Sequence, residues 1–291
     1  MKSRSIQLTA IFLGLAMGSS CQRQNNDSTA SAAELAELKV FDGQSGTINI
    51  AGGTAHIPVM KKAAKDIMRY NPDVKITIAG GGSGVGAQQV AKGLVDIGNT
   101  GRPLKESEAS QGLVSFPFAI DGVAVIINPK NQVANLTSEN VIAIYSGKIT
   151  NWKELGGQDQ TINLFTRDEA SGTRDVFVEK LLNNSPVASS ANVVASNGAM
   201  KTAVSNDANA IGYCSVGYMD DTVKAPQLNG VTPDKQSCVD GTYPVVRKLF
   251  MNTKGEPTGL TKALIEFIQG PQGAKHIISS GYIPIPAAAQ N

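Results

Sequence analysis

Three times along the chain, a strand-like segment is followed by a glycine-rich turn and then by a segment of helical character. These units begin at residues 46–50 (GTINI), 74–78 (VKITI) and 162–166 (INLFT). The first two alternate apolar with polar residues, as strands do, and Val59, Met60, Ala63, Ile67 and Met68 then recur at helical spacing. Strands that alternate with helices predict an α/β fold with mostly parallel sheets.

Further strands are expected at residues 122–128, 210–216 and 245–252, and a helix at 261–270. We expect the apolar residues of this helix to face a core. The chain shows no internal repeat of 20 to 50 residues, which argues against solenoids and propellers.

The three turns share one chemistry, because each joins glycine to a hydroxyl residue where a helix is expected to begin. They are Gly53-Thr54, Gly82-Ser83-Gly84 and Ser171-Gly172-Thr173. Glycine lets the backbone approach a ligand closely, and a helix N-terminus offers unpaired N–H groups and a partial positive charge. Such turns could together hold a small oxyanion.

Arg102 and Arg167 stand beside these turns, and a guanidinium group can meet two oxygens of a tetrahedral anion. Taken singly, each feature has an ordinary structural explanation. Serine and threonine are common helix N-caps, and a lone arginine usually forms a surface salt bridge. Three similar turns with two arginines favour an anion site, although the sequence does not show that they converge.

Competing sites fit less well. The loop at residues 80–86 (GGGSGVG) lacks the Lys-Ser/Thr ending of a nucleotide-binding P-loop, and Val85 breaks the spacing of a nucleophile elbow around Ser83. His56 and His276 are the only histidines, so neither a Ser-His-Asp site nor a zinc site is favoured. With 17% charged residues and a formal net charge of +2, the chain has no basic excess typical of nucleic-acid binding.

The N-terminus predicts export. Lys2 and Arg4 precede an apolar run of about a dozen residues, and small residues lead to Cys21, as in a secretory signal. We expect a signal peptide over residues 1–20 and a tether over 21–44. Cleavage would remove two positive charges and leave a mature chain without net charge.

Of the three cysteines, Cys21 belongs to the processing site, and its position resembles the acylated cysteine of bacterial lipoproteins. Cys214 and Cys238 remain. In an exported protein, two such cysteines are expected to form a disulfide, and the alternative is a pair of free buried thiols.

The chain resembles the phosphate-binding proteins of bacterial phosphate ABC transporters, which belong to the type II periplasmic binding proteins. The resemblance covers most of residues 45–285. Its most specific stretch is TRDEASGTRDVF (166–177), and the others are AGGTAHIPV (51–59), residues 80–104, FAIDGVAVIINP (118–129), IYSGKITNW (144–152), AIGYCSVGYMDD (210–221) and TYPVVRKL (242–249).

The resemblance implies an anion cage with one part from each lobe. It assigns as phosphate ligands Thr54, Ala55, Ser83, Arg167, Ser171, Gly172 and Thr173, with Arg102 and Asp121 as further candidates. Known members have an aspartate where this chain has Gly101, and that aspartate accepts the proton that phosphate carries. Its loss puts the basis for rejecting sulfate in doubt, and Asp121 is a candidate substitute.

The resemblance also implies a two-lobed fold with a mixed, mostly parallel sheet in each lobe and a hinge between them. Lobe one would combine residues 45–124 and 244–291, and lobe two residues 125–243. The expected function is binding of inorganic phosphate outside the cytoplasmic membrane, without catalysis or a cofactor, by a monomer that delivers the ion to a membrane permease. The alternatives are another tetrahedral oxyanion as ligand, a secreted phosphatase-like enzyme, or an adhesion protein with the same fold.

Overall fold

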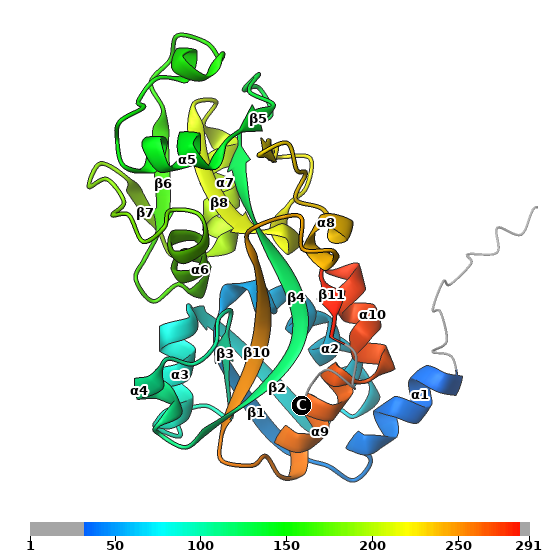
Figure 1. Ribbon diagram of the computed structural model, residues 1–291. Coiled ribbons are helices and arrows are strands. Elements are labelled where there is room, and N and C mark those ends of the chain that lie inside the picture. Colours follow the sequence, from blue (N-terminus) through cyan, green and yellow to red (C-terminus); the bar gives the residue numbers. More distant parts are fainter. Residues whose placement is uncertain (1–31, 286–291) are drawn as a thin grey trace, which may run out of the picture.

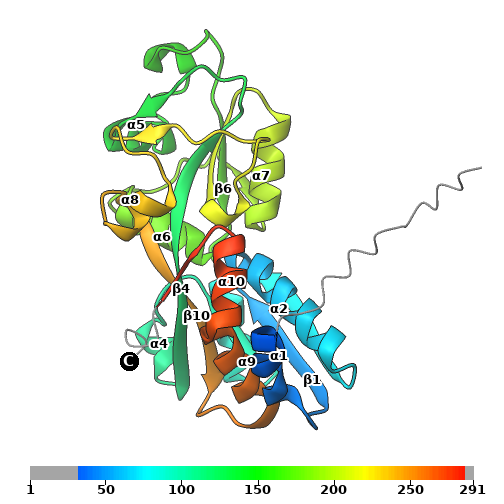
Figure 2. The same cartoon turned by 90° about the vertical axis from the view of Figure 1, so that its right-hand side faces the viewer.

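The computed structural model describes residues 32–285 and has two lobes joined by long strands (Figures 1 and 2). Both the predicted signal peptide and Cys21 lie outside the described residues. The first lobe contains α1 (Ala32–Leu38), β1 (Gly46–Gly52), α2 (Ile57–Tyr70), β2 (Val74–Gly81), α3 (Ser83–Ala91), β3 (Ile97–Thr100), α4 (Glu106–Ala109), α9 (Gly259–Gln269), α10 (Pro271–Ser279) and β11 (Ile283–Pro284).

The second lobe contains β5 (Asn135–Leu136), α5 (Ser138–Tyr145), β6 (Asn163–Arg167), α6 (Gly172–Lys180), β7 (Asn192–Val194), α7 (Asn197–Asn206), β8 (Ala210–Ser215), β9 (Gln227–Leu228) and α8 (Lys235–Val239). Short 3-10 turns occur at η1 (Lys39–Phe41), η2 (Thr54–His56), η3 (Trp152–Leu155) and η4 (Val216–Tyr218). Two long strands, β4 (Leu113–Ile127) and β10 (Val246–Lys254), run between the lobes (Figure 1).

The strands form one hydrogen-bonded path in the order β2-β1-β3-β10-β4-β8-β6-β7. The outer pairs β1–β2, β1–β3, β6–β7 and β6–β8 are parallel, as the strand-turn-helix units predict. Antiparallel pairs surround the crossing strands, where β4 pairs with β10 and then with β8. The fold is therefore α/β with a mixed sheet, and β4 carries the hydrogen bonding from one lobe into the other.

Each lobe has its own hydrophobic core. In the first lobe, the apolar face of α2 (Val59, Met60, Ala63) packs with β1, α9 and the start of β4. The α9 residues expected to face a core, Leu264, Ile265, Phe267 and Ile268, are buried there. In the second lobe, alternate residues of β4 enter cores on opposite sides of the sheet. The crossing strands thus belong to both lobes, which suits them to act as a hinge.

The disulfide expected between Cys214 and Cys238 is absent from the described residues, and both thiols are free and buried. Cys214 lies on β8 in the core that contains Ala124 and Met200. Cys238 lies on α8 in the core that contains Val123 and Val125. The Cys238 sulfur packs against β4 at Gly122, where an added Cβ atom would lie 2.7 Å from it. The expectation was wrong, and the alternative of two buried thiols holds.

Part of the expected tether is folded onto the first lobe. Residues 32–41 form α1 and η1, and the side chains of Leu38 and Phe41 are buried in that lobe's core. The Glu37 carboxylate also accepts a hydrogen bond from the backbone N–H of Gln272 at the start of α10. A free tether could thus include only residues before this segment.

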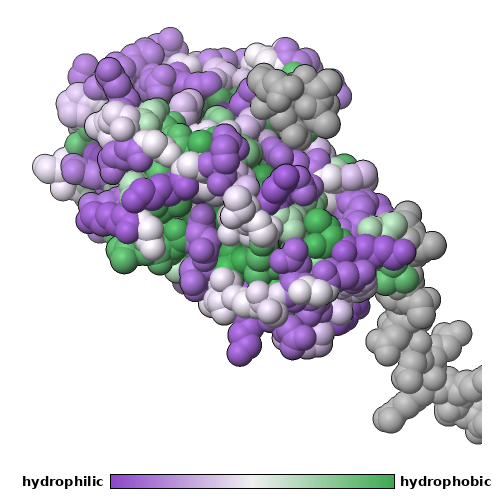
Figure 3. Space-filling view, turned by 90° about the horizontal axis from the view of Figure 1, so that it is seen from below, coloured by the Kyte–Doolittle hydropathy of each residue, from purple (hydrophilic) through white to green (hydrophobic). Residues whose placement is uncertain are grey.

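The surface seen from below the first lobe has hydrophobic areas interrupted by hydrophilic side chains (Figure 3). Large exposed apolar side chains belong to separate elements, including Leu35 on α1, Val193 on β7 and Ile278 on α10. No helix within residues 32–285 is both long and apolar enough to cross a membrane.

Candidate functional site

The three glycine-hydroxyl turns meet between the lobes around a small cavity, with about 10 Å³ open to the centre of a water-sized sphere. The first lobe contributes Gly53, Thr54, Ala55, Gly82, Ser83 and Gly101, the second contributes Arg167, Ser171, Gly172 and Thr173, and Arg247 comes from the crossing strand β10. A cavity this small excludes a metabolite, since about 10–15 Å³ on this measure holds a single water molecule.

The first turn follows β1 and requires glycine. Gly52 has a φ of 119°, and a Cβ atom there would lie 2.4 Å from the carbonyl oxygen of Asn99. The turn leads into η2, in which Thr54 and Ala55 are buried. Close packing against β3 therefore places the Thr54 hydroxyl at the cavity wall.

The second turn brings the two lobes into direct contact. Gly82 has a φ of 89°, and a Cβ there would lie 2.5 Å from the Ala170 carbonyl oxygen of the other lobe. The backbone N–H of Gly84 donates to the same carbonyl at 2.9 Å. Ser83 begins α3, and its hydroxyl accepts a hydrogen bond from the N–H of Gly101 at 2.9 Å.

The third turn joins β6 to α6. Ser171 is the N-cap of α6, and its hydroxyl accepts a hydrogen bond from the N–H of Arg174 at 3.2 Å. Gly172 and Thr173 form the first turn of the helix, whose N–H groups have no partner within the helix. The N-termini of α3 and α6 thus both lie at the cavity, and both favour negative charge there.

Arg167 is the strongest electrostatic feature of the cavity. Its side chain is 1% exposed, and its Nε and Nη2 atoms donate to the carbonyl oxygens of Val194 and Ala195. The third nitrogen, Nη1, is buried without a hydrogen-bond partner. Burial lowers the pKa of this guanidinium from its usual value. A buried cationic donor left unpaired is costly, so its place at the cavity points to an anionic ligand.

Arg247 also lines the cavity and was missed in the sequence. Its Nε atom donates to the Asp121 carboxylate at 2.8 Å, and Nη2 lies 2.7 Å from the same oxygen. Its Nη1 donates to the carbonyl oxygen of Gly101 at 3.3 Å. A Cβ atom on residue 101 would lie 2.7 Å from Nη1, so glycine at this position makes room for the guanidinium.

A signal for Arg247 did exist. Arg247 lies within TYPVVRKL (242–249), one of the stretches that carry the family resemblance, but the sequence alone could not show that it pairs in register with Asp121 on β4. Asp121 is fully buried and does not line the cavity. Burial raises the pKa of Asp121, while Arg247 and the Ser215 hydroxyl oppose that shift. Among the described residues that line the cavity, none carries a carboxylate.

Arg102 lies outside the cavity, although it follows Gly101 directly. Its guanidinium group is paired with Glu108 of its own lobe and with Asp175 on α6 of the other, each at 2.7 Å. The structure therefore brings together Thr54, Ala55, Ser83, Arg167, Ser171, Gly172 and Thr173, and it places Arg102 and Asp121 elsewhere.

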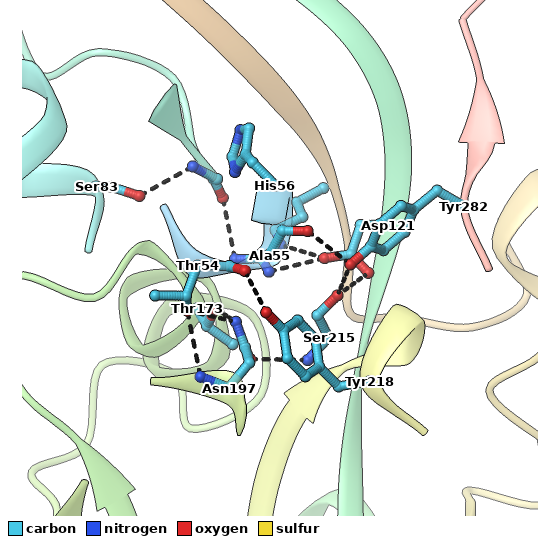
Figure 4. Close-up of polar contacts among 12 residues, drawn as sticks. Thr54, Ala55, His56, Ser83, Asp121, Thr173, Asn197, Ser215, Tyr218 and Tyr282 are labelled. Carbon is cyan, nitrogen blue, oxygen red and sulfur yellow. Dashed lines mark hydrogen bonds and ion pairs between the residues drawn. The ribbon is translucent and has the colours of Figure 1, made fainter. Parts of the chain in front are cut away.

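Several other side chains hold the first turn in place (Figure 4). Tyr218 donates to the carbonyl oxygen of Thr54, and Tyr282 donates to that of Ala55, both at 2.7 Å. Asn197, at the start of α7, contacts the Thr54 hydroxyl. Within residues 32–285, no group of three His, Cys, Asp or Glu side chains is arranged to hold a metal ion.

Comparison with known proteins agrees with this geometry. A family model described as a PBP superfamily domain matches residues 40–272. The chain is 34% identical to the phosphate-binding protein PstS of Bacillus subtilis (strain 168) over 98% of this chain and 95% of that protein. It is 28% identical to the phosphate-binding protein PstS of Borreliella burgdorferi over 82% and 90% of the two chains.

Solved structures give the same result. The described fold is similar to a putative phosphate ABC transporter substrate-binding protein with bound phosphate from Clostridium perfringens, with a TM-score of 0.78, 34% identity and coverage of 82% and 100%. It is also similar to an ABC-type phosphate transport receptor from Vibrio cholerae, with a TM-score of 0.67, 37% identity and coverage of 82% and 100%. The chain therefore belongs to the PBP superfamily and, within it, to the family of the phosphate-binding proteins called PstS.

Proposed function

We propose that the protein binds inorganic phosphate outside the cytoplasmic membrane and delivers it to the permease of an ABC transporter. The unpaired, buried Nη1 atom of Arg167 is the observation that supports this most strongly. It lies at a small cavity with two helix N-termini, four hydroxyl groups and a second arginine. This donor set matches the oxygens of one tetrahedral anion.

The anion ligands of the proposal are Thr54, Ala55, Ser83, Arg167, Ser171, Gly172, Thr173 and Arg247. The two relatives named above that bear the name PstS are called phosphate-binding proteins, which favours phosphate over other tetrahedral oxyanions. Binding would proceed without chemistry: the lobes close on the anion by bending of β4 and β10, and the closed form is recognised at the membrane.

Calorimetry of the purified protein with inorganic phosphate tests the proposal. We expect saturable binding of one phosphate per chain, and we expect Arg167→Ala to weaken binding by at least about a hundredfold because it removes the buried counter-charge. Lys153→Ala is the matched control, since Lys153 forms an exposed pair with Asp159. An Arg167→Ala variant that bound phosphate like the wild type would contradict the proposed site.

A phosphatase-like enzyme is the alternative with a different kind of activity. Among the described residues that line the cavity there is neither a histidine nor a carboxylate to act as a general base for Ser83. We therefore propose a binding protein. Release of product from a chromogenic phosphate ester by the purified protein, lost in Ser83→Ala, would support the enzyme instead.

The location is proposed from the N-terminal sequence. Export by a signal peptide over residues 1–20 and acylation of Cys21 would hold a monomeric binding protein at the outer face of the membrane. Mass spectrometry of the membrane-bound protein tests this: we expect an acylated N-terminal Cys21, and we expect Cys21→Ala to abolish the acylation.

A further inference from the structure

Asn197 stands out because one buried side chain contacts two hydroxyl groups of the cage. Its backbone N–H and its Nδ2 atom both lie within hydrogen-bond distance of the Thr54 hydroxyl oxygen, at 3.2 and 3.0 Å. Nδ2 also lies 3.4 Å from the hydroxyl oxygen of Thr173. The side chain is fully buried, yet the cavity is not lined by it.

The orientation of the Asn197 amide is fixed by its surroundings. The backbone N–H of Ser215 lies 3.0 Å from the Oδ1 atom of Asn197. A backbone N–H can only donate, so the atom that faces it must be the amide oxygen. The NH₂ group must then face Thr54 and can only donate to it (Figure 4).

These bonds determine what the Thr54 hydroxyl can do. A hydroxyl group has one hydrogen to donate and two lone pairs that accept. Asn197 supplies two donors to the Thr54 oxygen, which occupy both lone pairs. The remaining O–H of Thr54 can therefore only donate, and Thr54 lines the cavity.

We propose that Asn197 is a positioning residue that makes the Thr54 hydroxyl an obligatory donor to the bound anion and thereby lowers the phosphate-over-sulfate preference of the cage. This inference rests on the proposed phosphate site. Thr54 belongs to the first lobe and Asn197 to the second, so the two bonds form only where the lobes meet. Closure of the two lobes therefore also orients the Thr54 hydroxyl as a donor.

The consequence for selectivity follows from the proton that phosphate carries and sulfate lacks. A cage that offers an acceptor to this proton favours phosphate, and a cage that offers only donors does not. With Gly101 in place of the family aspartate, no lining residue among those described offers a carboxylate, and Asn197 removes Thr54 as an acceptor. The polarity of the Thr54 hydroxyl therefore contributes to how well the two anions are distinguished, beside the hydroxyls of Ser83, Ser171 and Thr173.

Asn197→Asp tests the proposal with almost no change in shape. An ionised aspartate accepts where the NH₂ group donated, so the Thr54 hydroxyl turns toward it and exposes a lone pair to the anion. The added negative charge weakens the binding of both anions. At about pH 8 both are mainly dianions, so repulsion alone affects them equally.

The measurement is calorimetric affinity for inorganic phosphate and for sulfate at about pH 8. We expect Asn197→Asp to raise the phosphate-to-sulfate affinity ratio about tenfold, and we expect less than a twofold change when the same substitution is made in a Thr54→Val background. Asn128→Asp is the matched control: Asn128 is also buried and donates to carbonyl oxygens of α7, away from the cavity. It should leave the ratio unchanged.

The inference is overturned if Asn197→Asp leaves the phosphate-to-sulfate affinity ratio unchanged, or if the ratio rises equally in the Thr54→Val background. Either result would leave the proposed phosphate-binding function standing. Wild-type protein that bound neither anion would overturn the proposed function and this inference together. If Asn197→Asp did not fold, a double-mutant cycle of Asn197→Ala with Thr54→Val replaces it. We then expect a coupling of about tenfold in phosphate affinity, and additive effects would count against the proposal.

Discussion

Arginines occupy two regions between the lobes, and the regions differ in how those arginines are neutralised. In the inner cage, Arg167 has Asp168 at 3.7 Å and keeps one buried nitrogen unpaired, while Arg247 pairs with a single carboxylate, Asp121. At the outer pair, Arg102 is held by Glu108 and by Asp175, one from each lobe. The difference favours Arg167 and Arg247 over Arg102 as the proposed anion ligands, because two carboxylates already pair with Arg102.

The outer pair has a structural role of its own. Because Arg102 and Asp175 belong to different lobes, their ion pair forms when the lobes meet and does not require an anion. The proposed inner cage instead gathers Arg167 and Arg247, and burial, helped by the charge of Arg247, lowers the pKa of Arg167. The two regions should therefore respond differently to substitution, salt and acid.

Arg247→Ala should have the largest effect of these tests, because it removes a cage ligand and leaves Asp121 buried without its counter-charge. We expect a loss of about 3–5 kcal/mol in the free energy of unfolding, measured by urea denaturation, together with loss of phosphate binding. Adding Asp121→Asn should restore stability but not binding. Lys248→Ala, an exposed neighbour on the same strand, is the control. If Arg247→Ala were as stable as the wild type, the buried Arg247–Asp121 pair would contribute little to the free energy of unfolding.

Gly101→Ala should disturb the cage through Arg247 alone. The new methyl group would lie 2.7 Å from Nη1, so the guanidinium must move. We expect a destabilisation of about 1–3 kcal/mol and weaker phosphate binding. Gly198→Ala serves as control, because its methyl group would come no closer than 3.6 Å to a neighbouring atom. If Gly101→Ala and Gly198→Ala weakened phosphate binding equally, displacement of the Arg247 guanidinium would not explain the effect of Gly101→Ala.

Acid should act on the inner region through His56, directly behind the first turn. Burial, followed by the positive charge of Arg247, lowers the pKa of His56 from 6.5 to about 3. Between these values the unfolded chain binds the proton that the folded chain refuses, so stability falls as the pH drops below about 6.5. The contribution is at most about 1.4 kcal/mol per pH unit. Urea titrations of the wild type and His56→Gln at several pH values should show a shallower slope for the variant, and identical slopes would refute this assignment.

Asp175→Asn should have the smallest effect, because it weakens an ion pair at the partly exposed mouth of the cleft. We expect phosphate affinity to fall by no more than about fivefold, with a difference from the wild type that shrinks as salt is added. Asp159→Asn breaks a fully exposed pair with Lys153 and should change nothing. A loss as large as that of Arg167→Ala would mean that the outer pair belongs to the cage after all.

Much of the fold could be predicted from local patterns. The strands expected at residues 46–50, 74–78, 210–216 and 245–252 are the cores of β1, β2, β8 and β10, and the helix beginning near Ser171 is α6. The strand expected at 122–128 is only the second half of β4, which begins at Leu113. A register shift in the pairing of β4 with β10 occurs next to Pro117, and the Pro117 carbonyl oxygen accepts from the Gln269 side chain.

By itself, the sequence determined the α/β class, the three turns and the hydroxyl groups they present, since these depend on residues close together along the chain. Only the tertiary structure decided which arginine faces the cavity and that the two buried cysteines do not pair. Arg102 is diverted by Asp175 of the other lobe, and Arg247 is placed by the register of β10 on β4. Pairings between distant segments depend on how strands align and lobes close, and no local pattern encodes them.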